Sequence, residues 1–323
     1  VYNAIFAPNT SFNNEEAYLY IPTGSTFQEV KELAQPVLKN LETFEQVAKR
    51  KGYTSNVKAG KYAIKKGMNN NDIINTLRVN NIPVKVSFNN QETLADLAGR
   101  ISNQIEADSL SLLAAFEDKE FIKAQGFNEE TKLGMYLPNS YEFFWNTSSE
   151  EFRDRMVKEY DRFWNNERLQ KAKAEGLSPK EVTTLASLVH KETAKVDERP
   201  KVAGLYLNRL KRGMLLQADP TVIYAIKKSS GDFTQVIKRV LYKDLELDSP
   251  YNTYKYAGLP PGPITMPDIS AIDAVLNPET HDYLYFVADV ENFGYHKFAK
   301  TLAQHNRNKV QYVQWINEQK IKR

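Results

Sequence analysis

One carboxylate, Glu192, occupies a position from which it could transfer a proton. It follows Leu185, Leu188 and Val189 at the i, i+3, i+4, i+7 spacing of a single helix face, so it lies on the stripe that otherwise enters the core. A buried carboxyl group resists ionisation, and its pKa should rise toward the range in which it can donate a proton near neutral pH. The spacing therefore indicates a general acid.

The segment that must position Glu192 carries the signals of two consecutive helices. Ser178 and Glu181 form a capping box, so the first helix is predicted to begin at residue 178. The second is predicted to begin near Pro200 and to end at Gly213, which suits a left-handed C-cap. The alternative is that Glu192 only closes the last turn and points to water, because carboxylates near helix ends are commonly solvated.

Several long motifs follow one another in this region, and together they resemble a known family. They are KET at 191–193, ERP at 198–200, LYLNRL at 205–210, GMLLQADPTVIYA at 213–225, SPYNTY at 249–254 and GLPPGPI at 258–264. With these motifs the sequence resembles the endolytic murein transglycosylase family (YceG-like) of bacterial cell-wall enzymes, formerly described as aminodeoxychorismate lyase-like, over nearly the whole chain. The resemblance implies that the Glu of KET, here Glu192, is the catalytic acid.

The reaction that this resemblance implies is lytic cleavage of the bond between N-acetylmuramic acid and N-acetylglucosamine within peptidoglycan strands, which leaves 1,6-anhydro ends. One carboxyl group is sufficient, because it can protonate the leaving oxygen and then accept a proton from the C6 hydroxyl that attacks C1. Two alternatives stay open. One is a hydrolytic muramidase in which Asp219 or Glu198 positions a water molecule, and the other is a non-catalytic scaffold that binds peptidoglycan.

Polar residues on the turns that follow Glu192 are candidates for substrate contacts, because they are suited to holding acetamido and hydroxyl groups. They are Gln217, Asp219, Thr221, Tyr251, Asn252, Thr253 and Tyr254. The alternative is that these side chains cap turns, as Asp, Asn and Thr commonly do.

No cofactor or metal site is predicted. The chain has no cysteine, and its four histidines show no HExxH or comparable spacing. His190, two residues from Glu192, falls on a different helix face and is predicted to be solvated. There is no glycine-rich phosphate loop, and no lysine is singled out for pyridoxal phosphate. A net charge of +3 with interspersed acids and bases does not indicate nucleic-acid binding.

The predicted fold class is α+β, with a LysM-like N-terminal domain followed by a mainly helical catalytic domain with a small sheet. Residues 1–16 are predicted to be a membrane-proximal linker, residues 17–80 the LysM-like domain and residues 81–323 the catalytic domain. The LysM-like region is predicted from a strand, two helices and a strand, at 17–21, 26–33, 41–51 and 60–64. Such a region could bind glycan or serve only as a spacer.

Within the catalytic domain, the predicted strands are 83–88, 283–288 and 295–298, and the predicted helices include 236–242 and a closing helix over 301–320. The segment from Gly134 to Tyr141 lines up with a family segment that usually reads EG-x-L-x-PDTY. Here Leu133 replaces its Glu, and Asn139-Ser140 replaces Asp-Thr. A role in fixing the backbone survives these changes, but any role of the missing Glu does not.

The location is predicted from the resemblance. No apolar run approaches the roughly 20 residues of a membrane span. Members of the resembled family carry one N-terminal transmembrane helix, and this sequence begins as a chain trimmed after such a helix would. We therefore expect a single-pass protein of the cytoplasmic membrane with its catalytic domain on the periplasmic side. Peptidoglycan strands are the expected partner, together with the cell-wall synthesis machinery.

Overall fold

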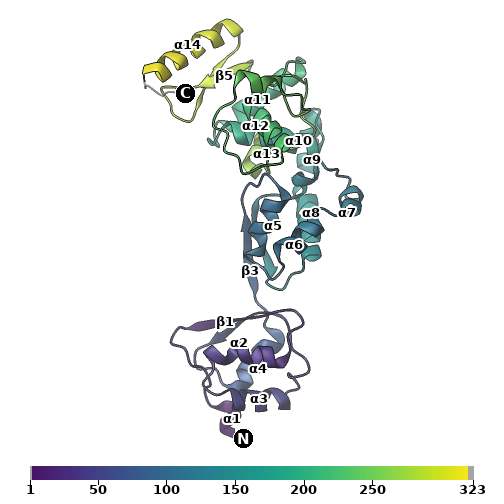
Figure 1. Ribbon diagram of the computed structural model, residues 1–323, viewed down its shortest axis with the longest axis vertical. Coiled ribbons are helices and arrows are strands. Elements are labelled where there is room, and N and C mark those ends of the chain that lie inside the picture. Colours follow the sequence, from purple (N-terminus) through teal and green to yellow (C-terminus); the bar gives the residue numbers. More distant parts are fainter. Residues whose placement is uncertain (1, 319–323) are drawn as a thin grey trace. The chain divides into compact units, whose positions relative to one another are not determined.

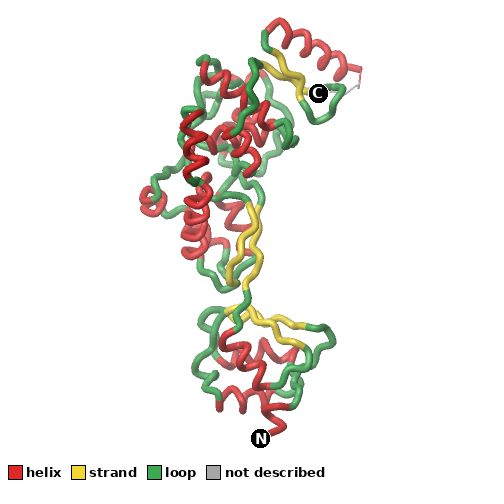
Figure 2. Tube along the Cα trace, turned by 180° about the vertical axis from the view of Figure 1, so that it is seen from behind, coloured by secondary structure: helices red, strands yellow, loops and turns green. Residues whose placement is uncertain are grey.

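The computed structural model of this protein describes residues 2–318, so Val1 and residues 319–323, which include the end of the predicted closing helix, lie outside the described part (Figure 1). The chain divides into two compact units. The first extends to residue 88 and adds 97–115 and 139–153, and the second takes 89–96, 116–138 and the remainder from 154 on. Helices and three two-stranded antiparallel sheets make up the described chain, which confirms the α+β class (Figure 2).

The N-terminal region is a small sheet covered by helices. Its elements are α1 (Tyr2–Phe6), β1 (Glu16–Ile21), α2 (Phe27–Ala34), the 3-10 helix η1 (Gln35–Val37), α3 (Leu41–Arg50), β2 (Gly60–Lys65) and α4 (Asn70–Val79). Strands β1 and β2 pair antiparallel, with Ile21 opposite Gly60. Leu19 and Ile21 are buried because alternate residues of β1 face the helices. The predicted order of strand, helix, helix and strand is confirmed.

The structure differs from the linker predicted for residues 1–16. Residues 2–6 are helical, and Asn9 is buried between later elements. The Asn9 side-chain amide donates hydrogen bonds to the backbone oxygen of Asn40 at 2.9 Å and to Oδ1 of Asn70 at 2.6 Å. These bonds fix the segment against α3 and α4, so from residue 2 on it is part of the folded region.

The chain continues through a second two-stranded sheet and a series of helices. The elements are β3 (Pro83–Phe88), α5 (Leu94–Ser102), α6 (Ser109–Phe116), α7 (Lys119–Ala124), η2 (Lys132–Met135), β4 (Asn139–Phe144), α8 (Ser149–Phe163) and α9 (Asn166–Ala174). Strand β4 was not predicted, and it pairs antiparallel with β3, with Ser87 opposite Ser140. The departures from the family motif at Asn139 and Ser140 therefore lie in a strand.

The C-terminal part carries Glu192. Its elements are α10 (Pro179–Glu192), α11 (Arg199–Lys211), α12 (Asp219–Ser230), η3 (Tyr242–Glu246), α13 (Ile269–Leu276), β5 (Tyr285–Ala288), β6 (His296–Ala299) and α14 (Leu302–Glu318). The helix predicted over 236–242 is wrong. Val236 is 82% exposed and Tyr242 83%, so the segment has no apolar partner against which a helix face could pack.

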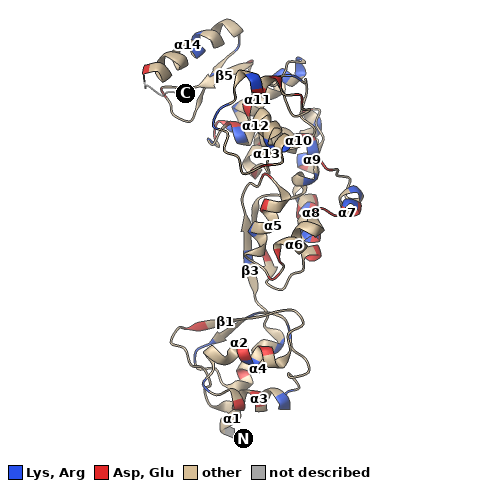
Figure 3. Cartoon of the chain, in the orientation of Figure 1, with Lys and Arg blue, Asp and Glu red and all other residues tan. Residues whose placement is uncertain are grey.

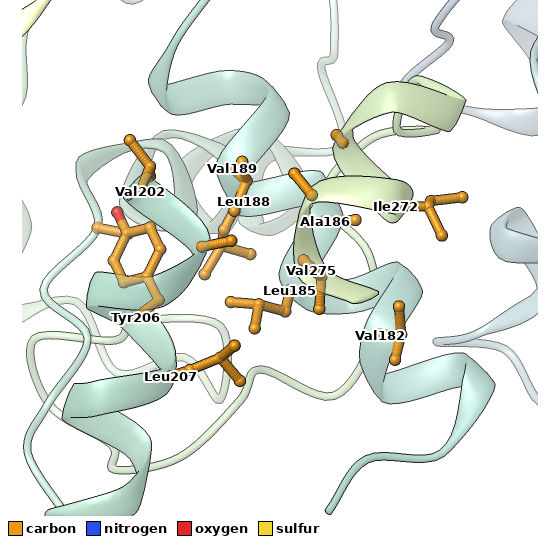
Figure 4. Packing of buried hydrophobic residues seen from close by; sticks show 14 of the residues in the cluster. Val182, Leu185, Ala186, Leu188, Val189, Val202, Tyr206, Leu207, Ile272 and Val275 are labelled. Carbon is orange, nitrogen blue, oxygen red and sulfur yellow. The ribbon is translucent and has the colours of Figure 1, made fainter. Parts of the chain in front are cut away.

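The core of this part is formed by α10, α11 and α13. Leu185 and Val189 of α10 are fully buried, and Figure 4 shows them packed between Tyr206 of α11 and Val275 of α13. The predicted capping box at the start of α10 is confirmed: Ser178 Oγ accepts from the Glu181 backbone N–H at 3.3 Å, and Glu181 Oε2 accepts from the Ser178 backbone N–H at 2.8 Å. The cap and the apolar face together fix the direction in which α10 delivers its last residue.

Acidic and basic residues occur on the same elements; helix α8, for example, carries both (Figure 3). Among residues 2–318, no helix is both long enough and apolar enough to span a bilayer.

Candidate active site

Glu192 is the last residue of α10. The three residues that precede it on the same face, Leu185, Leu188 and Val189, are fully buried, while Glu192 itself is half-buried. The helix stops there because Thr193 takes an extended backbone with φ of −138° and ψ of 131°. The carboxyl group therefore lies where the apolar stripe meets the surface, and it does not point freely to water.

A tyrosine of the neighbouring helix contacts this carboxyl group. Tyr206 of α11 is buried, and its hydroxyl donates a hydrogen bond to Glu192 Oε2 at 3.0 Å. Burial and the adjacent Glu192 raise the pKa of Tyr206 well above its usual range. The hydroxyl therefore stays protonated and remains a donor at any pH at which the protein works.

The surroundings of Glu192 keep a proton on it near neutral pH. Burial is the largest influence on its pKa and raises it, and Asp219 and Glu198 raise it further because they are carboxylates. His296 and the hydrogen bond from Tyr206 act in the opposite direction, since they stabilise the charged form. The net effect raises the pKa of Glu192 to about 7. Such a group can both donate and accept a proton at neutral pH.

Glu192 opens into a pocket of about 280 Å³. Its walls come from α10, α11, the start of α12, the β5–β6 hairpin and α14. The lining residues are Glu192, Arg209, Leu216, Gln217, Asp219, Tyr254, Phe286, Val287, Ala288, His296, His305 and Tyr312. A second pocket of about 350 Å³ meets the first at His296, which lines both.

Three of the seven predicted substrate contacts line the pocket with Glu192: Gln217, Asp219 and Tyr254. Gln217 has a φ of 52°, an uncommon conformation for a residue other than glycine. The Tyr254 hydroxyl donates to Asp219 Oδ1 at 2.5 Å. The Asp219 and Gln217 side chains line the pocket and are exposed, so a ligand could contact them.

The other four predicted contacts are buried, and their polar atoms are used inside the protein. Asn252 donates to the backbone oxygens of Leu245 and Leu247, at 2.9 and 2.8 Å. The Thr253 hydroxyl accepts from the backbone N–H of Ala218 and bonds to the Thr221 hydroxyl at 2.8 Å. The Tyr251 hydroxyl donates a hydrogen bond to Glu130 Oε2 at 2.6 Å.

This burial favours one of the two roles considered for the four residues, which are Thr221, Tyr251, Asn252 and Thr253. Their exposed fractions are 2% or less. A side chain whose polar atoms are buried and already bonded cannot contact a substrate in this conformation. The alternative role, capping turns, fits the hydrogen bonds of three of them. Thr221 and Thr253 bind the Ala218 backbone between Gln217 and Asp219, and Asn252 binds the backbone of the 245–247 segment.

A buried ion pair at the edge of the pocket was not predicted as a unit. Glu198 Oε2 lies 2.9 Å from His296 Nδ1, and Glu198 Oε1 accepts from the His296 backbone N–H at 2.6 Å. Burial alone would raise the pKa of Glu198, but the bonds from His296 and Thr193 outweigh it and lower the pKa. Glu198 is therefore ionised and engaged, which removes it as a candidate for positioning a water.

Arg209 is a further lining residue that the sequence did not single out. It is buried, and its guanidinium donates to the backbone oxygens of Leu284, Leu215 and Leu216 at 2.6, 2.9 and 3.0 Å. It thereby ties α11 both to the loop before α12 and to the segment before β5. Arg209 thus connects three of the segments beside the pocket.

The histidines divide between structural and pocket positions. His190, predicted to be solvated, has a side chain only 15% exposed and lies 3.3 Å from an Asp268 carboxylate oxygen, so that prediction is wrong. The cause is the packing of Asp268 and Arg199 over that helix face. Within the described residues, no group of three or more His, Cys, Asp or Glu side chains is arranged to hold a metal ion.

Comparison with known proteins identifies similar chains. The model of the YceG-like family matches residues 19–311. An endolytic murein transglycosylase of Bacillus subtilis is 33% identical over 317 residues, covering 92% of this chain and 85% of the relative. One of Streptococcus pneumoniae serotype 2 is 31% identical and covers 91% of this chain, which spans only 58% of that relative. A yceG-like protein of Listeria monocytogenes, with a 2.6 Å crystal structure, is 32% identical with a TM-score of 0.60, covering 91% of this chain and 99% of that one.

Proposed function

Because the chain belongs to the YceG-like family, we propose that it is a lytic transglycosylase that cleaves within peptidoglycan glycan strands. The observation that carries the proposal is the position of Glu192 in its pocket. A half-buried carboxyl group with a pKa of about 7, one hydrogen-bond donor and open space in front of it has the properties of a general acid.

In the proposed reaction, Glu192 gives its proton to the glycosidic oxygen as the bond between N-acetylmuramic acid and N-acetylglucosamine breaks. The C6 hydroxyl of the muramic acid attacks C1 and closes a 1,6-anhydro ring. Its oxygen is already tethered to the sugar, so it loses little entropy on reaching C1. The Tyr206 hydroxyl supports the step because it stabilises the carboxylate that Glu192 becomes.

Gln217, Asp219 and Tyr254 are the proposed substrate contacts. Gln217 lies just before α12, Asp219 is the first residue of that helix, and Tyr254 lies in the loop that precedes α13. Gln217 offers both an amide donor and an acceptor, which suits an acetamido group. The charged Asp219 carboxylate suits sugar hydroxyls.

Hydrolysis is the second candidate, and one observation favours it. Asp219 lines the same pocket as Glu192, so the site offers two carboxyl groups, as a hydrolytic muramidase requires. The products decide between the two reactions. Mass spectrometry of digested glycan strands should find 1,6-anhydro-N-acetylmuramic acid ends, and a majority of reducing ends would show that water is the nucleophile.

The role of Glu192 is tested by Glu192→Gln, which keeps the shape of the side chain and removes the acid. The variant should fold and should lose cleavage of intact sacculi by at least about a hundredfold. The matched control is Glu181→Gln in the same helix, because Gln also completes a capping box and residue 181 lies outside the pocket. Activity of Glu192→Gln within tenfold of the unchanged protein would rule out the assignment.

The N-terminal region is proposed to be a LysM-like unit that holds glycan near the pocket. It has a hydrophobic core of its own, from Leu19 to Leu77, which supports separate folding. Residues 2–80 expressed alone should be retained by purified sacculi. Retention no better than that of an unrelated protein of similar charge would reduce the region to a spacer.

The catalytic domain is proposed to lie outside the cytoplasmic membrane, because its proposed substrate, peptidoglycan, lies there. The membrane anchor and an association with cell-wall synthesis enzymes remain predictions from the family resemblance. Fractionation of cells that express the full natural protein tests the anchor: recovery in the soluble fraction without detergent would argue against it.

A further inference from the structure

His296 is the first residue of β6, and it lines the pocket with Glu192. Both oxygens of the buried Glu198 carboxylate bind it, one at the ring and one at the backbone N–H. The ring also packs against Phe286, with 4.8 Å between centroids. The imidazole is therefore held by one hydrogen bond and one ring contact, and its backbone by a second hydrogen bond.

The two ring nitrogens of His296 have different surroundings. An ionised carboxylate can only accept, so Nδ1 must carry a proton and donate it to Glu198. Among the described residues no hydrogen bond is made to Nε2, and this nitrogen is not enclosed in the protein interior. A carboxylate that fixes one nitrogen and leaves the other as an open lone pair is the arrangement that makes a histidine a general base.

We propose that His296, oriented by Glu198, is the base that accepts the proton of the attacking C6 hydroxyl, while Glu192 acts as the acid. This inference rests on the proposed function of the pocket. It names a second catalytic residue, because Nε2 would contact the reacting hydroxyl. Glu198 is a positioning residue that acts through the imidazole.

The step balances as follows. The C1–O bond to the leaving sugar breaks, and its oxygen takes the proton of Glu192. The C6 oxygen forms a bond to C1 with its own electron pair, and the hydroxyl proton passes to Nε2 of His296. One proton has moved from Glu192 to His296, and exchange with solvent restores both groups.

The titratable and charged groups around His296 come from four elements. Glu198 lies just before α11, Glu192 ends α10, Asp219 begins α12, and Arg209 belongs to α11. Helix α14 contributes His305 and Tyr312. A separate base also lets protonation and attack occur together, which a single carboxyl group cannot do.

The two roles are separated by the leaving group of the substrate. On natural glycan strands, both Glu192→Gln and His296→Gln should lower the rate by about 10²- to 10⁴-fold. On a synthetic glycan oligomer that releases nitrophenolate, no proton is needed by the leaving group. Glu192→Gln should then recover at least about tenfold relative to the unchanged protein, while His296→Gln should recover nothing.

His281→Gln is the matched control. His281 belongs to the same unit, and it binds the backbone of Lys201 and Tyr283, but it lies outside the pocket. It should leave the rates on both substrates within a few-fold of the unchanged protein. If His296→Gln does not fold, as judged by circular dichroism, Glu198→Gln serves instead, because it keeps the imidazole and removes the charge that orients it.

Several outcomes would overturn the inference. A His296→Gln rate within tenfold of the unchanged protein on natural strands would show that Glu192 acts alone, and the proposed lytic function would stand. Recovery of the His296→Gln rate on the nitrophenolate substrate would show that His296 assists the acid and is not the base. If Glu198→Gln is used in place of His296→Gln, an unchanged rate on natural strands overturns the inference. Reducing ends would instead remove the lytic function and leave His296 as the base for water.

Discussion

Two of the hydrophobic clusters in the described part of the chain differ in how they treat nearby polar groups. In the N-terminal region, Asn70 is 1% exposed and its amide is fully engaged. It donates to the Ala4 backbone oxygen at 2.7 Å and to the Thr43 hydroxyl at 3.1 Å, and it accepts from Asn9. At the end of α10, Glu192 has one hydrogen bond within residues 2–318, from Tyr206, and Asp219 and Glu198 disfavour its charged form.

The difference distinguishes a buried polar group that stabilises the fold, Asn70, from one that can carry out chemistry, Glu192. A satisfied network such as that of Asn70 favours one conformation and adds no chemistry. An incompletely compensated carboxyl group lowers the stability of the charged state, and it gains a pKa at which it can transfer protons. Five substitutions, in four experiments, test this contrast, from the largest expected effect to the smallest.

The largest effect is expected from removing the charge of Glu192. Its pKa is raised from 4.5 to about 7, so between these pH values the folded chain keeps a proton that the unfolded chain has lost. Stability should therefore fall by about 3 kcal/mol as the pH rises through this window. Glu192→Gln should abolish the fall and be more stable than the unchanged protein above pH 7.

Urea denaturation at pH 4 and at pH 8 measures this prediction. At the lower pH the side chain is largely uncharged in both states, so the two proteins should be nearly equal, which is the internal control. Equal stability at pH 8 would contradict the description of Glu192 as an uncompensated carboxyl group.

The opposite sign is expected for Asn70→Ala. The substitution leaves the Ala4 oxygen, the Thr43 hydroxyl and the Asn9 amide without their partner, and should cost about 2 kcal/mol. The loss should be the same at pH 4 and pH 8, because no titrating group is involved. A gain in stability, or a strong pH dependence, would remove the contrast between the two regions.

Tyr206→Phe removes the hydrogen bond that stabilises the charged form of Glu192. The lost hydrogen bond stabilised the carboxylate, so the pKa of Glu192 should rise above about 7. The alkaline limb of the pH–rate profile should then move to higher pH, and the rate at the optimum should fall about tenfold. An alkaline limb that stays in place or moves down would show that Glu192 is not the titrating acid.

The smallest effects are expected at the helix N-caps, because both regions begin a helix with a capping box. Thr26 caps α2 and Ser178 caps α10, and in both the hydroxyl accepts from the backbone N–H three residues on at 3.3 Å. Replacement of either by Ala should cost about 1 kcal/mol. Native-state amide exchange in each helix measures both, and a Ser178→Ala cost several times that of Thr26→Ala would show that the regions differ beyond the pocket.

Local signals predicted much of the fold and the position of Glu192. The capping box at Ser178 and the apolar spacing along α10 are contained within fifteen residues, so they could be read directly from the sequence. The same was true of β5 and β6, whose apolar residues are contiguous. Strand β4 was missed because its partner β3 begins 56 residues earlier, and NSYEFF has little alternation of its own.

The rest of the site depends on tertiary packing. Glu198 and His296 are 98 residues apart, and nothing local in either motif indicates that they meet. Tyr206 was not singled out from the sequence, because only the packing of α11 on α10 places its hydroxyl on Glu192. For Thr253 and Asn252 the residue types were informative but the directions of their side chains were not, because turns bury and expose polar groups with equal ease.

The two hydrogen bonds between Glu198 and His296 also affect how much the neighbouring turn can change. Because the carboxylate holds both the backbone and the ring of the first residue of β6, that residue is anchored independently of the turn at 289–295 that leads to it. The turn can thus be changed at the expense of its own contact, the Tyr295 hydroxyl on Asp197, while the imidazole keeps its hydrogen bond to Glu198. It is the natural place to insert a reporter or to graft a new binding segment beside the pocket, with the reactive groups left in register.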